Sequence, residues 1–222
     1  MKRFHQSILL LLFVLCGSTE LMAQNRMDSL IVFVGEKLSL DYEKMPVQYD
    51  TVMFGLDTLI SPVIQLDSRY KAKYKILQLV HGSYEAKTID FIVYDHYGVP
   101  AFSKFNHVLL FVSYHHGKLY HEKYQYFDLY KTKNGKWASP YSSSDYDHPY
   151  KENITVKPEQ IPFKKDLRFP LRQLSDRSIK LQFPTPYYEL KGGYAIPVFG
   201  NYVPELFRLT QETVLKARYN LK

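Results

Sequence analysis

The sequence predicts a mainly β protein: a small antiparallel barrel of the OB type or a β-meander, followed by an irregular proline-rich segment and a C-terminal helix. Two observations lead to this prediction. Between residues 29 and 141, apolar and polar residues alternate with a period of two, which is typical of half-buried strands. Nine of the twelve prolines then lie between Pro140 and Pro204, and proline interrupts both helix interiors and strand ladders.

The first residues have the pattern of a secretory leader. Lys2 and Arg3 precede the apolar run ILLLLFVLC, and the small residue Ala23 ends the stretch that follows. The apolar run is shorter than the about 20 residues that a spanning helix needs. We therefore expect a signal peptide over residues 1–23, cleaved after Ala23, and a secreted or periplasmic protein without a transmembrane segment.

The only cysteine, Cys16, lies inside this leader. A lipoprotein signal would need a small residue before the cysteine, and Leu15 and Val14 are bulky. The processed chain would then have no cysteine, so we expect an ordinary apolar core instead of disulfides.

Six strands are expected where the apolar pattern is clearest, namely at residues 29–42, 68–82, 87–98, 107–114, 119–133 and 136–141. Turns are expected at His115–Lys118 and at Asn134–Gly135, the latter of type I′, which needs positive φ at both central residues. Residues 45–67 contain either one more strand or a covering loop.

The C-terminal part is expected to add two short strands and one helix. RSIKLQF (177–183) and GYAIPVF (193–199) are the strand candidates, the second at a sheet edge because Pro197 lacks a backbone donor. Pro204 suits the first turn of a helix over residues 204–219. We expect a barrel-like domain over residues 24–149, with residues 150–222 packed on the same domain.

The segments IVFVGEKLSL, YKAKYKILQLVHGSY, KTIDFIVYD and HVLLFVSY follow one another in this order. Their order resembles a netrin-like module, the OB-type domain of the tissue inhibitors of metalloproteases, and the resemblance extends over roughly half of the chain. The resemblance implies the fold. It does not imply that this protein inhibits metalloproteases, because the inhibitors begin with a mature N-terminal cysteine and this chain would begin at Gln24.

The segment from Tyr94 to Tyr126 contains five of the eight histidines and raises the question of a metal site. HEKYQ at residues 121–125 has Gln125 where H-E-x-x-H needs its second histidine, and it lies on an expected strand instead of a helix. His115, His116 and His121, with His96 and Asp95, have no spacing that demands an ion. We predict no metal and no cofactor.

Two hydrolase arrangements are weaker alternatives. Residues 142–148, SSSDYDH, contain serine, aspartate and histidine, but crowded into one loop-like run instead of being assembled by the fold. Asp90, Glu122 and Asp128 are carboxylates that could act as a glycosidase pair, although charges on an outer strand face are usually only solvated. We predict no catalytic residue.

Tyrosine is the remaining signal, with twenty in the chain. Exposed tyrosine is favoured at binding sites, although it also covers cores with its hydroxyl in water. The candidate binding surface consists of Tyr120, Tyr124, Tyr126, Tyr130, His115, His116 and His121.

These observations predict a non-catalytic binding or structural accessory protein, with a secreted hydrolase using a Tyr/His/carboxylate surface as the alternative. The partner would be an unknown envelope or extracellular protein or a glycan. The formal net charge is +7, but no run of Lys and Arg exceeds two residues, so a nucleic-acid partner is not expected.

The exported form is predicted to begin at Gln24 because LMA precedes that residue. Intact-mass measurement of the exported protein checks this prediction. A lipid-modified species that begins at Cys16 would contradict it.

Overall fold

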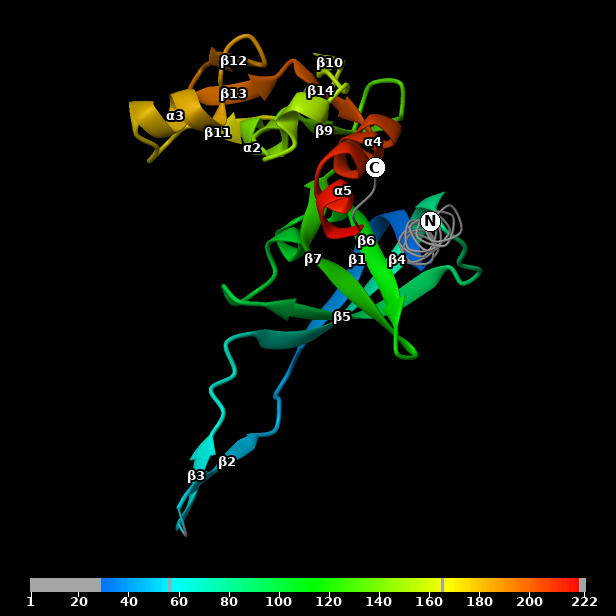
Figure 1. Ribbon diagram of the computed structural model, residues 1–222. Coiled ribbons are helices and arrows are strands. Elements are labelled where there is room, and N and C mark those ends of the chain that lie inside the picture. The colour runs from blue at the N-terminus through cyan, green and yellow to red at the C-terminus, as the bar shows by residue number, and fades with distance from the viewer. Residues whose placement is uncertain (1–28, 56, 165, 220–222) are drawn as a thin grey trace, which may run out of the picture. The chain divides into compact units, whose positions relative to one another are not determined.

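The computed structural model describes residues 29–219 apart from residues 56 and 165 (Figure 1). The described chain divides into two compact units. The barrel unit comprises residues 33–79 and 83–128, and the C-terminal unit comprises residues 29–32, 80–82 and the described residues from 129 onward. The expected signal peptide, residues 1–23, and its cleavage after Ala23 lie outside the described residues.

Five strands close into a barrel in the order β1-β4-β5-β7-β6. Their bounds are β1 Leu30–Glu43, β4 Ser68–His81, β5 Thr88–Asp95, β6 His107–His115 and β7 Lys118–Asp128. β4–β5 and β6–β7 pair antiparallel, whereas β5 and β7 pair in parallel where Ile92 faces Tyr120. A closed five-stranded ring with this order is an OB-type barrel, so the predicted fold class is confirmed.

The strands turn every second side chain into the barrel, and many of the residues at these inward positions are aromatic. Along β4, Tyr70, Ala72 and Tyr74 are buried and the lysines between them are exposed. The ring of Tyr74 lies 5.7 Å from Phe91 and 6.0 Å from Phe102, the buried residue of the 3₁₀ turn η1 (Ala101–Lys104). These contacts fill the centre of the barrel.

Residues 45–67, for which the sequence allowed either one more strand or a covering loop, contain a β-hairpin. β2 (Tyr49–Phe54) and β3 (Asp57–Pro62) pair antiparallel with each other to form a separate two-stranded sheet (Figure 1). We call residues 47–66 the arm. At its root, Arg69 Nε lies 3.0 Å from Glu43 Oε2, which joins the strands that enter and leave the arm.

The two expected turns are both present, and the one turn whose type was predicted, at Asn134–Gly135, is of another type. At the β6–β7 turn, His116 (φ 47°) and Gly117 (φ 77°) are both left-handed, as a type I′ turn requires. At Asn134–Gly135, only Gly135 has positive φ, and Thr132 N donates to Lys136 O at 2.9 Å. The prediction of a type I′ turn there was wrong, because a longer loop needs only one left-handed residue.

Two small sheets make up most of the C-terminal unit. The first has the order β10-β14-β9-β8, with β8 Tyr130–Lys131, β9 Trp137–Pro140, β10 Glu159–Gln160 and β14 Phe199–Tyr202. The second has the order β11-β13-β12, with β11 Phe169–Pro170, β12 Tyr188–Lys191 and β13 Tyr194–Pro197. Short helical segments α2 (Ser143–Tyr146) and η2 (Lys151–Asn153) lie between the strands in sequence.

Two sequence predictions in this unit were wrong. RSIKLQF is the helix α3 (Asp176–Gln182), which begins because the Ser175 hydroxyl caps it by accepting from Ser178 N at 3.2 Å. Pro197 does not mark an edge strand, because β13 is the central strand of its sheet. The sheet accommodates Pro197 because it is the last residue of β13, where the ladder ends.

The expected C-terminal helix is present as two shorter helices, α4 (Val203–Glu212) and α5 (Val214–Tyr219), with Pro204 in the first turn. Thr213, between them, has φ −119° and ψ −94°, which are not helical values. The hydroxyls of Thr210 and Thr213 donate to the carbonyls of Leu206 and Leu209, a pattern that bends helices. Among the residues described, no helix has the length and apolar character to cross a membrane.

Gly200 is predicted to be essential for the pairing of β14 with β9. A Cβ at this position would lie 2.1 Å from the carbonyl oxygen of Ser139. Gly200→Ala should therefore cost about 2 kcal/mol or more, since the clash falls on backbone. Gly135→Ala is the control: its Cβ would meet open space, and the cost is limited to positive φ, about 1–2 kcal/mol. Urea unfolding measures both, and a Gly200→Ala variant as stable as wild type would contradict the prediction.

Candidate functional site

An open groove of ≈ 600 Å³ lies where β5, β7 and the root of the arm meet in the barrel unit. One wall comes from the barrel, and the other comes from the chain that enters and leaves the arm. The residues lining it are Met45, Gln48, Ile64, Gln65, Leu66, Asp67, Tyr94, His96, Lys123 and Tyr124.

The barrel wall of this groove depends on a bulge in β7. Between the pairs Leu110↔Tyr126 and Val112↔His121, β6 advances by two residues while β7 advances by five. Residues 122–125 therefore leave the regular ladder. Tyr124 has φ 66°, an unusual conformation for a residue with a bulky side chain. Bulges of this kind redirect side chains and are over-represented next to active sites.

Contacts on both sides of the bulge hold it in place. His121 Nε2 lies 2.9 Å from Gln125 O, which closes the excluded segment. The imidazole of His121 packs 4.6 Å from the buried ring of Phe102. The hydroxyl of Ser113 on β6 donates to the carboxylate of Glu122. Because these groups fix both ends of the bulge, Lys123 and Tyr124 project from a defined support.

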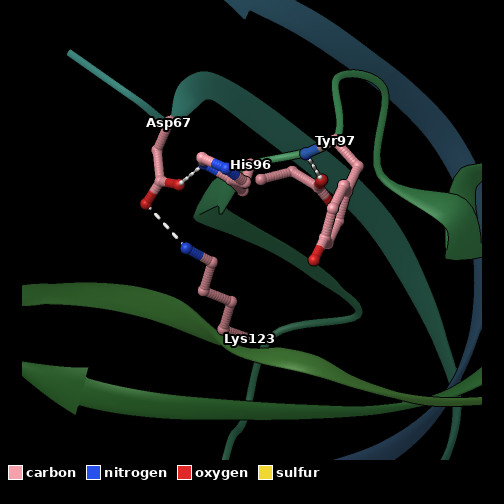
Figure 2. A network of polar contacts seen from close by, with 5 residues as sticks. Asp67, His96, Tyr97 and Lys123 are labelled. Carbon is pink, nitrogen blue, oxygen red and sulfur yellow. Dashed lines mark hydrogen bonds and ion pairs between the residues drawn. The ribbon is translucent and has the colours of Figure 1, made fainter. Parts of the chain in front are cut away.

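A small polar network crosses the groove (Figure 2). Asp67 Oδ2 accepts a hydrogen bond from Lys123 Nζ at 2.7 Å, and Asp67 Oδ1 lies 3.5 Å from His96 Nδ1. The hydrogen bond to Asp67 is the largest of the causes that raise the pKa of Lys123. All three side chains are about one third to one half exposed, so the network is open to solvent and to a ligand.

Four tyrosines lie at or near this network in two ring pairs. Tyr97 N donates to Asp95 Oδ1 at 2.8 Å, which fixes the turn after β5 (Figure 2). The ring of Tyr97 lies 5.9 Å from that of Tyr124. Tyr97 is 85% exposed. On the outer face of β5 and β7, the rings of Tyr94 and Tyr120 stack at 6.4 Å with only 12° between their planes.

The structure does not bring the seven residues of the sequence-based surface together. Tyr120 and Tyr124 lie at or beside the groove. Tyr126 contacts Phe102 and Phe105, His121 packs on Phe102, and Tyr130 belongs to the C-terminal unit, where it contacts Phe169. His115 and His116 contact each other in the β6–β7 turn, and the ring of His115 also lies 6.5 Å from that of Tyr120. The sequence pattern predicts unbroken alternation along residues 119–133, and the bulge in β7 breaks it.

The candidate metal and hydrolase residues have other partners. No group of three or more His, Cys, Asp or Glu within the described part of the chain is placed to share an ion. Asp90 lies 3.9 Å from Lys71 Nζ. In the 142–148 run, the hydroxyls of Ser142 and Ser144 bond to each other at 2.7 Å, and His148 Nδ1 accepts from Tyr150 N at 3.1 Å. This is the bonding of a turn and not of a nucleophile with its base.

Comparison of the chain with protein-family models, curated proteins and solved structures finds no match.

Replacing Asp67 with Asn is predicted to lower the pKa of Lys123 toward its ordinary value, because the principal hydrogen bond that raises it loses its charge. Stability at neutral pH should change by about 1 kcal/mol or less, as for other exposed pairs. In wild type, the contribution of the pair is present at neutral pH and is lost as pH rises through the raised pKa.

An NMR pH titration of the lysine side chains measures this shift, with Asp90→Asn, beside Lys71, as the matched control. An unchanged Lys123 pKa in the Asp67 variant would show that the contact does not form in solution.

Proposed function

We propose that this protein is a secreted or periplasmic, non-catalytic binding protein that takes a neutral glycan in the groove between the β7 bulge and the root of the arm. The observation that supports this proposal best is the bulge itself. A tyrosine held at φ 66° costs conformational energy, and such strain persists where the surrounding structure enforces it, often at functional sites.

The groove has the chemistry that a sugar requires. Tyr94 and Tyr124 offer ring faces that can stack on the C–H face of a pyranose. Around them, Gln48 and Gln65 supply amide donors and acceptors, and the Asp67–Lys123 pair supplies one acceptor and one donor. OB-type barrels use this region, including the loop between their first two strands, to bind oligosaccharides and oligonucleotides.

The charge of the groove favours a neutral ligand. Lys123 is already hydrogen bonded to Asp67, so its charge is largely balanced within the protein. An anionic ligand would have to compete with Asp67 for the ammonium, and it would meet the carboxylate at close range. A hydroxylated neutral ligand can bond to both groups without displacing either of them.

Binding is favoured over the alternative, a hydrolase that uses the Tyr/His/carboxylate surface. Serine, threonine and cysteine are absent from the described residues that line the groove. The Asp67–His96 contact thus has no serine, threonine or cysteine nucleophile to activate there, and its 3.5 Å separation is long for a catalytic dyad. The resemblance to netrin-like modules concerns the fold, and it does not favour either binding or hydrolysis, since fold alone does not imply function.

Neutral oligosaccharides of glucose, mannose and N-acetylglucosamine are the probes that test the proposal. Calorimetric titration of the full chain should show binding to one of these series. Tyr124→Ala should weaken it at least tenfold, about 1.4 kcal/mol, because a stacking platform is removed. Tyr150→Ala is the matched control, since Tyr150 is a comparably exposed tyrosine in the C-terminal unit.

Two results would overturn the proposal. Equal affinities for wild type and the Tyr124 variant would remove the groove from the binding site. Release of shorter sugars on incubation with wild type, abolished in His96→Ala, would replace binding with hydrolysis.

A further inference from the structure

The arm presents an unusual amount of apolar surface. All residues of β2 and β3 are exposed except Ser61, which is half-buried. Within the arm, Met53 is 67% exposed, Phe54 78% and Ile64 82%. Its large apolar side chains with at least two fifths of their surface exposed are Val47, Tyr49, Val52, Met53, Phe54, Leu59, Ile60, Val63, Ile64 and Leu66.

This surface is too large to be incidental. If a large side chain offers roughly 150–250 Å², these residues together present on the order of 1,000 Å² to solvent. Strand pairing divides these residues between the two faces of the ribbon, so each face presents several hundred Å². Patches of that size are among the largest that monomers expose, and they often mark interaction sites. An isolated two-stranded ribbon is also only marginally stable in water. The arm therefore has the properties of a segment that is covered in the functional state.

Charge distinguishes one face of the ribbon from the other. Directly paired residues share a face, so Asp50, Val52, Phe54, Asp57, Leu59 and Ser61 lie on one side. That side has an apolar centre between two carboxylates. Residues 45–66 contain these two aspartates and no basic residue, in a chain whose formal net charge is +7. The arm is thus an acidic and apolar element on a basic protein.

A surface of complementary character lies on the outer face of β4 of the same chain. Lys71, Lys73 and Lys75 alternate along this face, and Leu77 and Leu79 continue it with 36% and 38% of their surface exposed. Lys71 lies 3.9 Å from Asp90 and Lys75 lies 3.6 Å from Glu36, both exposed pairs of the weak kind. Lys73 stands between them, with no ion pair in the described structure.

We propose that the arm of one copy of this protein lies on the outer face of β4 of a second copy, in a reciprocal two-fold dimer. The carboxylates of the arm would face the lysines, and Val52, Phe54 and Leu59 would cover Leu77 and Leu79. In this arrangement each copy places its arm on β4 of the other, so both arms and both β4 faces are used and the assembly ends at the dimer. Two arms supply enough surface for a standard interface of about 1,600 Å².

A membrane is the other occupant that an apolar hairpin could have, and the charges disfavour it. Segments that lie in the membrane interface combine their apolar face with lysine and arginine, which meet anionic headgroups. The arm carries negative charge instead, with Asp57 beside the turn of the hairpin. A basic protein surface is the better match.

Sedimentation velocity of the full chain over a range of micromolar concentrations tests the dimer. Wild type should show a monomer–dimer equilibrium, and Phe54→Ser with Leu59→Ser should raise the dissociation constant at least tenfold. The control is Leu181→Ser, because Leu181 is 68% exposed but lies in α3 of the C-terminal unit. Neither substituted arm residue lines the groove, so glycan binding should be unchanged in the arm variant.

Charge reversal tests the partner surface directly. Asp50→Lys with Asp57→Lys, and separately Lys71→Glu with Lys73→Glu, should each abolish association at the same concentrations. An equimolar mixture of the two variants should associate again, because each arm then meets a face of opposite charge. This rescue in trans cannot come from misfolding of either variant.

Four outcomes would overturn the proposal. These are a monomeric wild type at the highest concentration, a dimer that is unaffected by the arm variant, failure of the charge-reversed variants to associate when mixed, and binding of the wild type to vesicles of phosphatidylethanolamine and phosphatidylglycerol that the arm variant loses.

Discussion

Closure of the barrel depends on β7, which pairs with β6 on one side and with β5 on the other, and residues 122–125 leave the ladder between its two stretches of pairing with β6. The contacts of His121 define where the exclusion begins. Its ring packs on Phe102 in the core, and its Nε2 lies 2.9 Å from the carbonyl of Gln125. The same residue thus completes the aromatic interior and supports the wall of the groove, so core packing and site geometry depend on each other.

The alternation of polar and apolar residues was sufficient to predict most of the barrel. On β4, residues 70 to 75 alternate strictly between buried and exposed, so the period of two identified both the strand and its buried face. It failed on β7, where a bulge changes the face of each residue that follows it. The sequence carries no local signal for this change, since positive φ at Tyr124 is imposed by tertiary contacts instead of being favoured by tyrosine.

The groove was less predictable than the fold, because tertiary contacts without a local sequence signal also decide which residues line it. Asp67 and Lys123 are 56 residues apart, and only barrel closure brings them to 2.7 Å. Tyr120 and Tyr124 could be selected from the sequence because exposed tyrosine is itself a signal, whereas nothing marks Asp67 as different from other aspartates. In the C-terminal unit, RSIKLQF was predicted as a strand because its length and composition suit one. It forms the helix α3 instead, which the hydroxyl of Ser175 caps at its N-terminus.

One connection, between β1 and β4, carries both the arm and a wall of the groove. Met45 and Gln48 precede β2, and Ile64, Gln65 and Leu66 follow β3, and all of these residues line the groove. A partner that covers the ribbon and a ligand that fills the groove would therefore act on the same stretch of backbone. Linkage requires that any effect of one on the affinity of the other be reciprocal. The contact between Arg69 and Glu43 ties the two ends of this connection to each other at the barrel, so both effects would act on a segment whose ends are held together.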